Sequence, residues 1–194
     1  MLDLYSGLGG ASQAFADRGW EVVRVDNNPL LADVPHTEIN DIMSLLRPYH
    51  FGEPFDFIWA SPPCVEFSTA YSAPGQIAKR ENRDFKPDMS LTEKAKEIID
   101  YLNPRYWVIE NVRGADKHIS KVLQMPPRQI VNQFYFWGKF PFIHIDSNWR
   151  HSKYDGDKWS SDPLRANYRA KIPLEISHAF LREIEEQTTL EGWL

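Results

Sequence analysis

With 194 residues, of which 42% are hydrophobic and 25% charged, the chain is long enough for one domain with a buried core and is neither disordered nor fibrous. No apolar run approaches the about 20 residues of a membrane helix, and the N-terminus lacks the basic start of a signal peptide. The single cysteine excludes an internal disulfide and a zinc cluster of thiolates, so we expect a cytoplasmic protein with no membrane and no metal partner. The net charge of −5 is unfavourable for a chain that wraps nucleic acid unaided.

The first half of the chain alternates strand-like and helix-like segments. Apolar and β-branched runs predict three strands and one helix: strands over 1–5, 21–25 and 56–60, and a helix over 11–18. A tight turn is expected at the glycines of residues 7–10. Gly19 is expected to end the helix, because glycine readily adopts the left-handed conformation of helix C-termini.

The second half continues this alternation and then becomes irregular. The predicted elements, in chain order, are a helix over 90–102, strands over 106–109 and 134–137, and a helix over 174–186. Ser90 and Glu93 have the spacing of a capping box at the start of the first of these helices. Residues 138–173 are rich in aromatic residues, Pro, Asp and Ser, with weak periodicity, and we expect loops and short strands there.

Strands that alternate with helices predict parallel βαβ units, hence an α/β fold with a doubly wound, mostly parallel sheet. We expect a single domain over residues 1–194, in which 1–137 forms the core, 138–173 a reduced loop region and 174–186 a closing helix. In such sheets ligands bind beyond the carboxyl ends of the strands. The unusual residues of this chain fall at predicted strand ends, which places the expected site there.

The segment Asp3-Leu4-Tyr5-Ser6-Gly7-Leu8-Gly9-Gly10 places glycines between a strand and a helix. Glycine permits a sharp turn and lets a ligand approach the helix N-terminus. An ordinary strand–helix connection would explain the pattern equally well. Asp26, at the end of the next predicted strand, is suited to accept hydrogen bonds from ribose hydroxyls, and Asp41 to accept from an adenine amino group.

The sharper signal is Ser61-Pro62-Pro63-Cys64-Val65-Glu66-Phe67-Ser68. Two prolines stiffen the backbone before the only thiol of the chain and so fix its direction. A lone cysteine is more often a small buried hydrophobe, but the position of Cys64 at a strand end favours a nucleophile.

Glu110 and Asn111 follow another apolar strand. Burying a carboxylate is unfavourable unless it has a partner or a task. Glu110 is therefore either paired with a cation, for which Arg113 is the local candidate, or part of the active site.

Taken in order, these three segments resemble the DNA (cytosine-5)-methyltransferases, and the resemblance covers about residues 1–114. It implies a Rossmann-like class I fold, S-adenosylmethionine as cofactor, and methylation of cytosine C5 through a covalent intermediate on Cys64, with Glu110 as the second catalytic residue. In its compact size the chain resembles family members from bacteriophages and prophages, and restriction–modification is the implied context.

Further roles carried over by position concern the cofactor and the target base. Tyr5 would stack on adenine, the glycines would lie beside the methionine part, and Glu110 would hydrogen-bond the cytosine ring. The implied cofactor-binding residues are Asp3, Tyr5, Ser6, Gly7, Gly9, Gly10, Asp26, Asn27, Asp41, Ile42 and Pro62. The implied substrate-binding residues are Pro63, Ser68, Asn111 and Arg113.

The chain departs from the family pattern in three places. Of the family's Gln-x-Arg-x-Arg segment, only the Gln is present, in residues Gln129 to Tyr135. Residues Arg169 to Pro173 occupy the place of the family's Gln-x-Gly-Asn segment. The family's large target-recognition domain is missing. DNA contacts are therefore expected from the basic residues of 79–86 or from 139–171, a stretch with seven Lys/Arg and four Asp. A partner protein could also supply recognition.

Three functions remain open on sequence grounds. The first is cytosine-C5 methylation of DNA. The second is the same chemistry on RNA or a free cytidine nucleotide, and the third is a catalytically silent module that binds S-adenosylmethionine and regulates a partner. A nicotinamide-dependent dehydrogenase is disfavoured because the glycines lack the G-x-G-x-x-G spacing.

Overall fold

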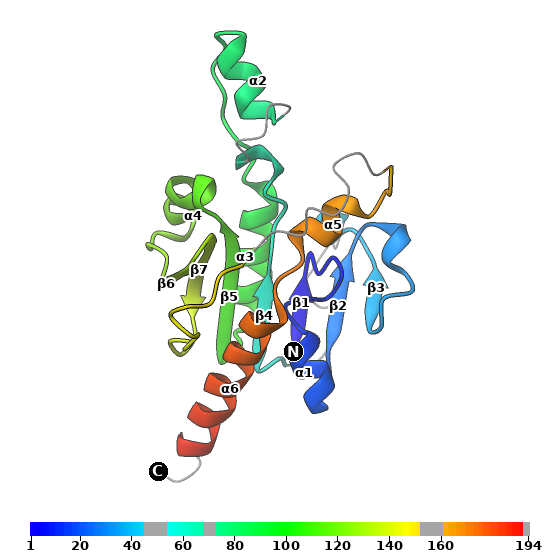
Figure 1. The fold of residues 1–194 in the computed structure, drawn as a ribbon, viewed down its shortest axis with the longest axis vertical. Helices are drawn as coiled ribbons and strands as arrows, with labels where there is room; N and C mark the ends of the chain where they lie inside the picture. Colours follow the sequence, from blue (N-terminus) through cyan, green and yellow to red (C-terminus); the bar gives the residue numbers. More distant parts are fainter. Residues whose placement is uncertain (45–53, 68–72, 152–160, 192–194) are drawn as a thin grey trace. The chain divides into compact units, whose positions relative to one another are not determined.

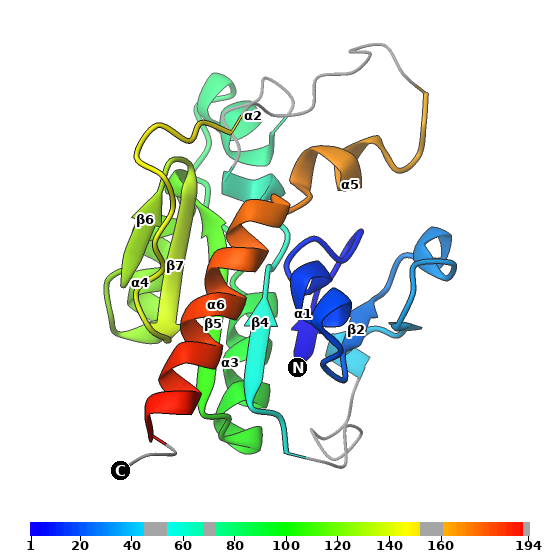
Figure 2. The ribbon, with the colours of Figure 1, turned by 60° about the horizontal axis from the view of Figure 1, so that its bottom comes forward.

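A computed structural model describes residues 1–44, 54–67, 73–151 and 161–191. The chain forms two compact units, each with its own strands: unit 1 comprises Met1–Ser44 and Phe140–Leu194, and unit 2 comprises Leu45–Lys139. Figures 1 and 2 show the elements of both units from two directions.

Unit 1 contains three short parallel strands in the order β3-β2-β1. Its elements are β1 (Leu2–Leu4), α1 (Gln13–Arg18), β2 (Val23–Asp26), β3 (Thr37–Ile39), α5 (Arg165–Ala170) and α6 (Leu174–Glu191). The register pairs Leu2 with Val23 and Leu4 with Val25, so apolar residues of neighbouring strands lie side by side. β1 is buried along its whole length, which is why it has no polar alternation except Asp3.

The first and last helices of the chain belong to unit 1, where α6 packs on α1 (Figure 2). Ser177 is buried on α6; the backbone N–H of Ala14 donates to its hydroxyl over 3.1 Å, and the hydroxyl donates to the carbonyl of Ala11 over 2.7 Å. Gly19 ends α1 with φ +93°, as the sequence predicts. Leu174, the first residue of α6, is exposed.

Unit 2 contains four strands in the order β4-β5-β7-β6, the first pair parallel and the others antiparallel. Its elements are β4 (Phe57–Ala60), α2 (Pro74–Arg80), α3 (Ser90–Leu102), β5 (Tyr106–Val112), α4 (Asp116–Leu123), β6 (Gln129–Val131) and β7 (Phe134–Lys139). β4 is completely buried, and α3 and α4 contact each other. In Figure 1, α2 extends beyond the carboxyl ends of β4 and β5.

The predicted α/β class with mostly parallel strands is confirmed. The sequence did not predict five short elements, β3, α2, α4, β6 and α5, and other differences lie at element ends. The predicted capping box is wrong: Ser90 lies inside α3, and the carboxylate of Asp88 accepts its backbone N–H over 2.8 Å. Residues 138–173 contain the helix α5, and their described part contains no strand beyond the end of β7. No helix in the described ranges has the length and apolar character needed to span a bilayer.

Candidate active site

The glycine segment of unit 1 forms a tight turn directly after β1. Tyr5, Gly7 and Gly9 all have positive φ, of 59°, 52° and 70°. A side chain on Gly10 would collide with the backbone carbonyl of Ile172, so the chain passes where only glycine fits. The path of the turn at the carboxyl end of β1 therefore depends on glycine at position 10.

Asp26, at the end of β2, is tied to this turn. The backbone N–H of Gly7 donates to Oδ2 of Asp26 over 2.9 Å, and that of Asn28 donates to Oδ1 over 3.0 Å. Each carboxylate oxygen can accept a second hydrogen bond, so Asp26 retains the capacity to bind a pair of vicinal hydroxyls. Asn27, the neighbour that the sequence also predicts, is exposed.

Tyr5 and Asp41 lie near each other in unit 1. Burial, together with the negative charge of Asp41, raises the pKa of the Tyr5 hydroxyl above its usual range. Asp41 also caps the short 3₁₀ turn Ile42–Ser44, since its Oδ1 accepts the N–H of Met43 over 3.0 Å. Ile42 is buried while Asp41 is exposed. An aromatic ring, a buried aliphatic side chain and a carboxylate are groups that can stack on a planar base and accept its N–H groups.

Asp3 supports the turn from the inside of unit 1. Its side chain is buried, and its Oδ2 accepts a hydrogen bond from Ser12 over 2.6 Å. Desolvation raises the pKa of Asp3 to about 7, although Ser12 and the positive charge of Arg24 act in the opposite direction. Within the described ranges, Asp3 Oδ1 and the hydroxyl of Ser6 are buried polar atoms without a hydrogen-bond partner.

In unit 2, β4 leads into the Pro-Pro-Cys turn. Cys64 is half-buried, and its carbonyl accepts the N–H of Phe67 over 3.0 Å at the start of a short 3₁₀ turn. Pro62 is buried and Pro63 is exposed. The amide of Asn111 donates to the carbonyl of Pro62 over 2.9 Å, which fixes the backbone two residues before the thiol.

Glu110 is buried beside this turn and belongs to the adjacent strand. Ala60 pairs with Ile109 in parallel register, so Ser61 and Glu110 come next to each other at the ends of the paired segments. The hydroxyl of Ser61 donates to Glu110 Oε2 over 3.0 Å and itself accepts the indole N–H of Trp59 over 2.8 Å. This chain of hydrogen bonds fixes the orientation of the carboxyl group.

The expected end of this strand at Ile109 is wrong, because β5 continues to Val112. Its last three residues pair with β7, Glu110 with Phe136, Asn111 with Tyr135 and Val112 with Phe134. Glu110 and Asn111 are therefore held by strand pairing and not by a loop. Arg113 follows in an exposed 3₁₀ turn, and Ser68 lies outside the described residues.

Several residues that support these two turns were not predicted from the sequence. Ser61 and Trp59 orient Glu110. Gly114 lies against the carbonyl of Phe67, so that a side chain there would collide with the turn that follows Cys64. In unit 1, the amide nitrogen of Asn167 on α5 lies 3.6 Å from the position of a Cβ on Gly7. These contacts join residues far apart in sequence, and the only local signal is glycine itself at position 114.

The described residues contain no cluster of three or more side chains suited to hold a metal ion. The donor set fits a nucleoside cofactor with an amino-acid tail instead. Asp26 has acceptor capacity left for hydroxyls, and Tyr5 lies near Asp41, so an aromatic ring and a carboxylate are available for a base.

Residues 1–138 match the model of the C-5 cytosine-specific DNA methylase family, and the chain belongs to this family. A Frog virus 3 (isolate Goorha) protein named as a DNA (cytosine-5)-methyltransferase is 34% identical over 122 residues, which are 57% of this chain and 52% of that protein. The type II methyltransferase M.HindV of Haemophilus influenzae (strain ATCC 51907 / DSM 11121 / KW20 / Rd) is 27% identical over 147 residues, 71% of this chain and 43% of that one.

Among solved structures, the chain is similar to a prophage-encoded protein of E. coli described as a DNA modification methyltransferase, with a TM-score of 0.49 and 19% identity over 71% of this chain and 45% of that one. The chain spans about half the length of these relatives. The family match begins at β1 and ends within β7, so it contains both the glycine turn and the Pro-Cys turn.

Proposed function

We propose that the protein transfers the methyl group of S-adenosylmethionine to C5 of cytosine in DNA, with Cys64 as the nucleophile and Glu110 as the group that activates the ring. The observation that carries this proposal is the hydrogen-bonded arrangement in unit 2. Asn111 holds Pro62, Ser61 holds Glu110, and both links converge on the turn that bears the single thiol. The family membership supplies the class of chemistry.

Cytosine C5 becomes nucleophilic only after a thiolate adds at C6. In the proposed reaction the Cys64 sulfur forms a bond to C6, and the electrons of the C5–C6 double bond move toward C5. Glu110, hydrogen-bonded to the ring N3 and the exocyclic amine, stabilises the charge that develops on the ring. When bound, S-adenosylmethionine would supply a methyl group from its positively charged sulfur to C5, and the neutral thioether would be the leaving group. Loss of the C5 proton then expels the Cys64 thiolate and restores the ring.

We further propose that unit 1 provides the cofactor contacts. Asp26 accepts hydrogen bonds from the ribose, Tyr5 with Ile42 and Asp41 contacts adenine, and the glycine turn lies along the methionine part. The remaining contacts carried over from the family are Asp3, Ser6, Asn27 and Pro62 for the cofactor, and Pro63, Ser68, Asn111 and Arg113 for the substrate.

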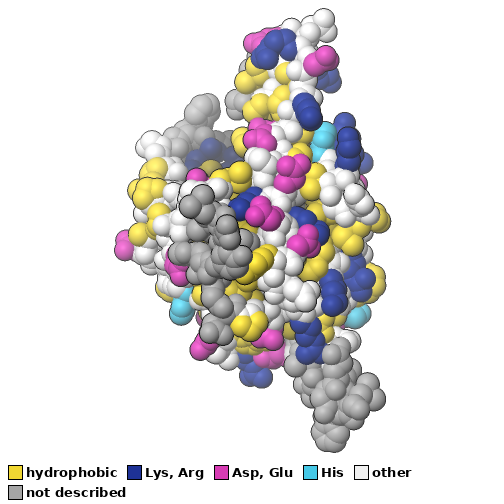
Figure 3. Space-filling model, turned by 180° about the vertical axis from the view of Figure 1, so that it is seen from behind, with side chains coloured by type: hydrophobic (Ala, Val, Ile, Leu, Met, Phe, Trp, Pro, Cys, Tyr) yellow, Lys and Arg dark blue, Asp and Glu magenta, His cyan; other side chains and the backbone are white. Residues whose placement is uncertain are grey.

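For DNA contacts we propose the exposed basic side chains Lys79 and Lys86 in and after α2. The surface around α2 carries both basic and acidic side chains (Figure 3). Phosphate contacts make binding salt-dependent, and a base inside a duplex must leave the stack to be methylated. Replacing both lysines with Glu should weaken DNA binding and reduce its salt dependence, with cofactor affinity unchanged.

The test is a transfer assay with tritium in the methyl group of S-adenosylmethionine. Duplex DNA, single-stranded DNA, tRNA and dCMP are offered in parallel to the wild type and to the Cys64→Ser variant. We expect label in DNA that disappears in Cys64→Ser while cofactor binding, followed by calorimetry, is unchanged. Label in RNA or dCMP alone would show that RNA or a free nucleotide, and not DNA, is the substrate. Cofactor binding without any transfer would indicate a regulatory module.

A further inference from the structure

An arginine is buried in the middle of unit 1, which is unusual for a residue with a permanent charge. Arg24 lies in β2 between Val23 and Val25, and its relative exposure is 1%. Burying an unpaired guanidinium is strongly destabilising, so the surrounding groups must compensate for the lost hydration. Desolvation lowers the pKa of Arg24, and the charges of Asp3 and Asp17 oppose this change.

The guanidinium joins three separate segments of the unit. Its Nε donates to the hydroxyl of Ser12 over 2.8 Å, and Ser12 donates onward to Asp3 over 2.6 Å. Nη1 donates to the carbonyl of Pro35 over 2.8 Å and Nη2 to the carbonyl of Gly9 over 3.3 Å. Arg24 therefore links the start of α1, the segment before β3, and the glycine turn.

The glycine turn also packs tightly against the guanidinium. A Cβ on Gly9 would lie 2.5 Å from both Cζ and Nε of Arg24, and Gly9 has φ +70°. The backbone of the turn thus rests directly on the guanidinium, with no space for a side chain between them. The carbonyl of Gly9 accepts a hydrogen bond from the same guanidinium, so both packing and hydrogen bonding join the turn to Arg24.

These contacts point to a role beyond packing. The conformation of the turn depends on the positions of Gly9 and Gly10. Arg24 is the side chain that lies directly against Gly9 from the interior of the unit. Ser12 connects the side chains of Asp3 and Arg24 by hydrogen bonds. A purely apolar core residue of similar length would fill the space but would anchor none of the three segments.

We propose that Arg24 is a positioning residue for the cofactor, which fixes the glycine turn through Gly9, Ser12 and Asp3 in the conformation that receives the methionine part. This inference rests on the proposed use of S-adenosylmethionine. Arg24 does not itself contact the cofactor; it acts through the turn.

The test compares Arg24→Met, which keeps the length of the side chain but removes its hydrogen bonds, with the matched control Val25→Ala. Val25 is buried in the same strand, and because side chains alternate along a strand it points to the opposite face. Affinities for S-adenosylmethionine and for 5′-methylthioadenosine, which lacks the amino-acid part, are measured by calorimetry on the full chain, with thermal unfolding followed in parallel.

We expect Arg24→Met to weaken S-adenosylmethionine binding by about tenfold or more, as is typical for the loss of hydrogen bonds from a charged group, and to change 5′-methylthioadenosine affinity much less. Arg24→Lys, which retains the buried charge, should recover part of the loss. Val25→Ala should lower the unfolding temperature without this selective effect.

Wild-type affinity for both ligands in a folded Arg24→Met variant would overturn the proposal, as would an equal loss for both ligands. If Arg24→Met does not fold, Ser12→Ala removes one link and leaves the charge; it must weaken S-adenosylmethionine selectively, or the proposal fails. Failure of the wild type to bind either ligand would contradict the proposed function instead, so the two failures are distinguishable.

Discussion

The two units differ in how polar side chains support the turn at the end of their first strand. In unit 1, Asp3, Ser12 and Arg24 form a buried network beneath the glycine turn and support it from the inside. In unit 2, Glu110 and Asn111 lie on a strand and make hydrogen bonds directly to Ser61 and Pro62 of the turn that bears the nucleophile. The comparison indicates that buried side chains support the glycine turn, the proposed cofactor-binding turn of unit 1. The turn of unit 2 that bears Cys64 is instead held by direct hydrogen bonds from the neighbouring strand. Variants should therefore separate cofactor binding from chemistry.

The largest effect is expected at Glu110. Replacement by Gln keeps the shape and the contact with Ser61 but removes the ionisable group, so methyl transfer should fall about 10²- to 10⁴-fold, the usual contribution of a general acid or base. Cofactor affinity should stay within about twofold, because no proposed cofactor contact of unit 1 changes. Single-turnover transfer and calorimetry measure the two quantities. Glu93→Gln, exposed on α3, is the control, and an equal loss there would remove the assigned role.

The second effect concerns the pH dependence of unit 1. The pKa of Asp3 is raised from 3.8 to about 7, so the folded state binds this proton more tightly than the unfolded state. Its stabilising contribution is present below pH 4 and is lost as pH rises toward 7, by up to about 4 kcal/mol. Urea unfolding between pH 4 and pH 8 should show this decline in the wild type.

Asp3→Asn should lose that part of the pH dependence whatever its absolute stability. Asp33→Asn, which changes an exposed carboxylate of the same unit, should keep it. An unchanged pH profile in Asp3→Asn would show that the buried carboxyl does not titrate in this range.

A smaller effect separates two glycines of unit 1 that both have positive φ. Gly19→Ala should cost about 1–2 kcal/mol of unfolding free energy from backbone strain alone, because no atom lies within 4 Å of the new methyl group. Gly9→Ala adds a collision with Arg24 and should therefore cost more and also weaken cofactor binding. Equal costs, with cofactor affinity retained in both variants, would mean that the guanidinium moves aside freely.

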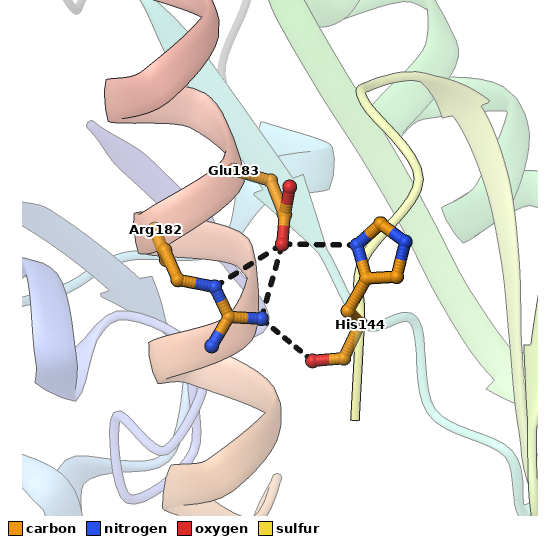
Figure 4. Close-up of polar contacts among 3 residues, drawn as sticks. All are labelled: His144, Arg182 and Glu183. Carbon is orange, nitrogen blue, oxygen red and sulfur yellow. Dashed lines mark hydrogen bonds and ion pairs between the residues drawn. The ribbon is translucent and has the colours of Figure 1, made fainter. Parts of the chain in front are cut away.

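The smallest effect is expected at the surface cluster of His144, Arg182 and Glu183 (Figure 4). Burial opposes ionisation of Glu183, but hydrogen bonds from Arg182 (3.0 Å) and His144 (3.2 Å) outweigh it and lower the pKa of the carboxyl. Because His144 is largely exposed, His144→Ala should cost less than about 1 kcal/mol near pH 6. His178→Ala, exposed on the same helix α6, is the control for chemical denaturation.

The sequence predicted those parts of the molecule that carry a local signal. Glycines marked the turn after β1 and the end of α1, and apolar runs located β4 and β5. The length of β5 was underestimated because its last residues are fixed by pairing with β7, a contact between distant segments. Arg24 was missed for a similar reason: a single arginine in a β-branched run usually faces solvent, and only the tertiary contacts with Ser12, Gly9 and Pro35 show that it is buried.

The central claim is that Cys64 attacks C6 of cytosine. Its most direct test uses duplexes of random sequence that contain 5-fluorocytosine, because fluorine at C5 prevents the proton loss that would release the sulfur. With S-adenosylmethionine present, the account predicts a denaturation-resistant complex in which peptide mass spectrometry finds the methylated base on Cys64, and none in Cys64→Ser. Transfer of methyl groups to unmodified DNA without any such complex, or a complex that persists in Cys64→Ser, would contradict it.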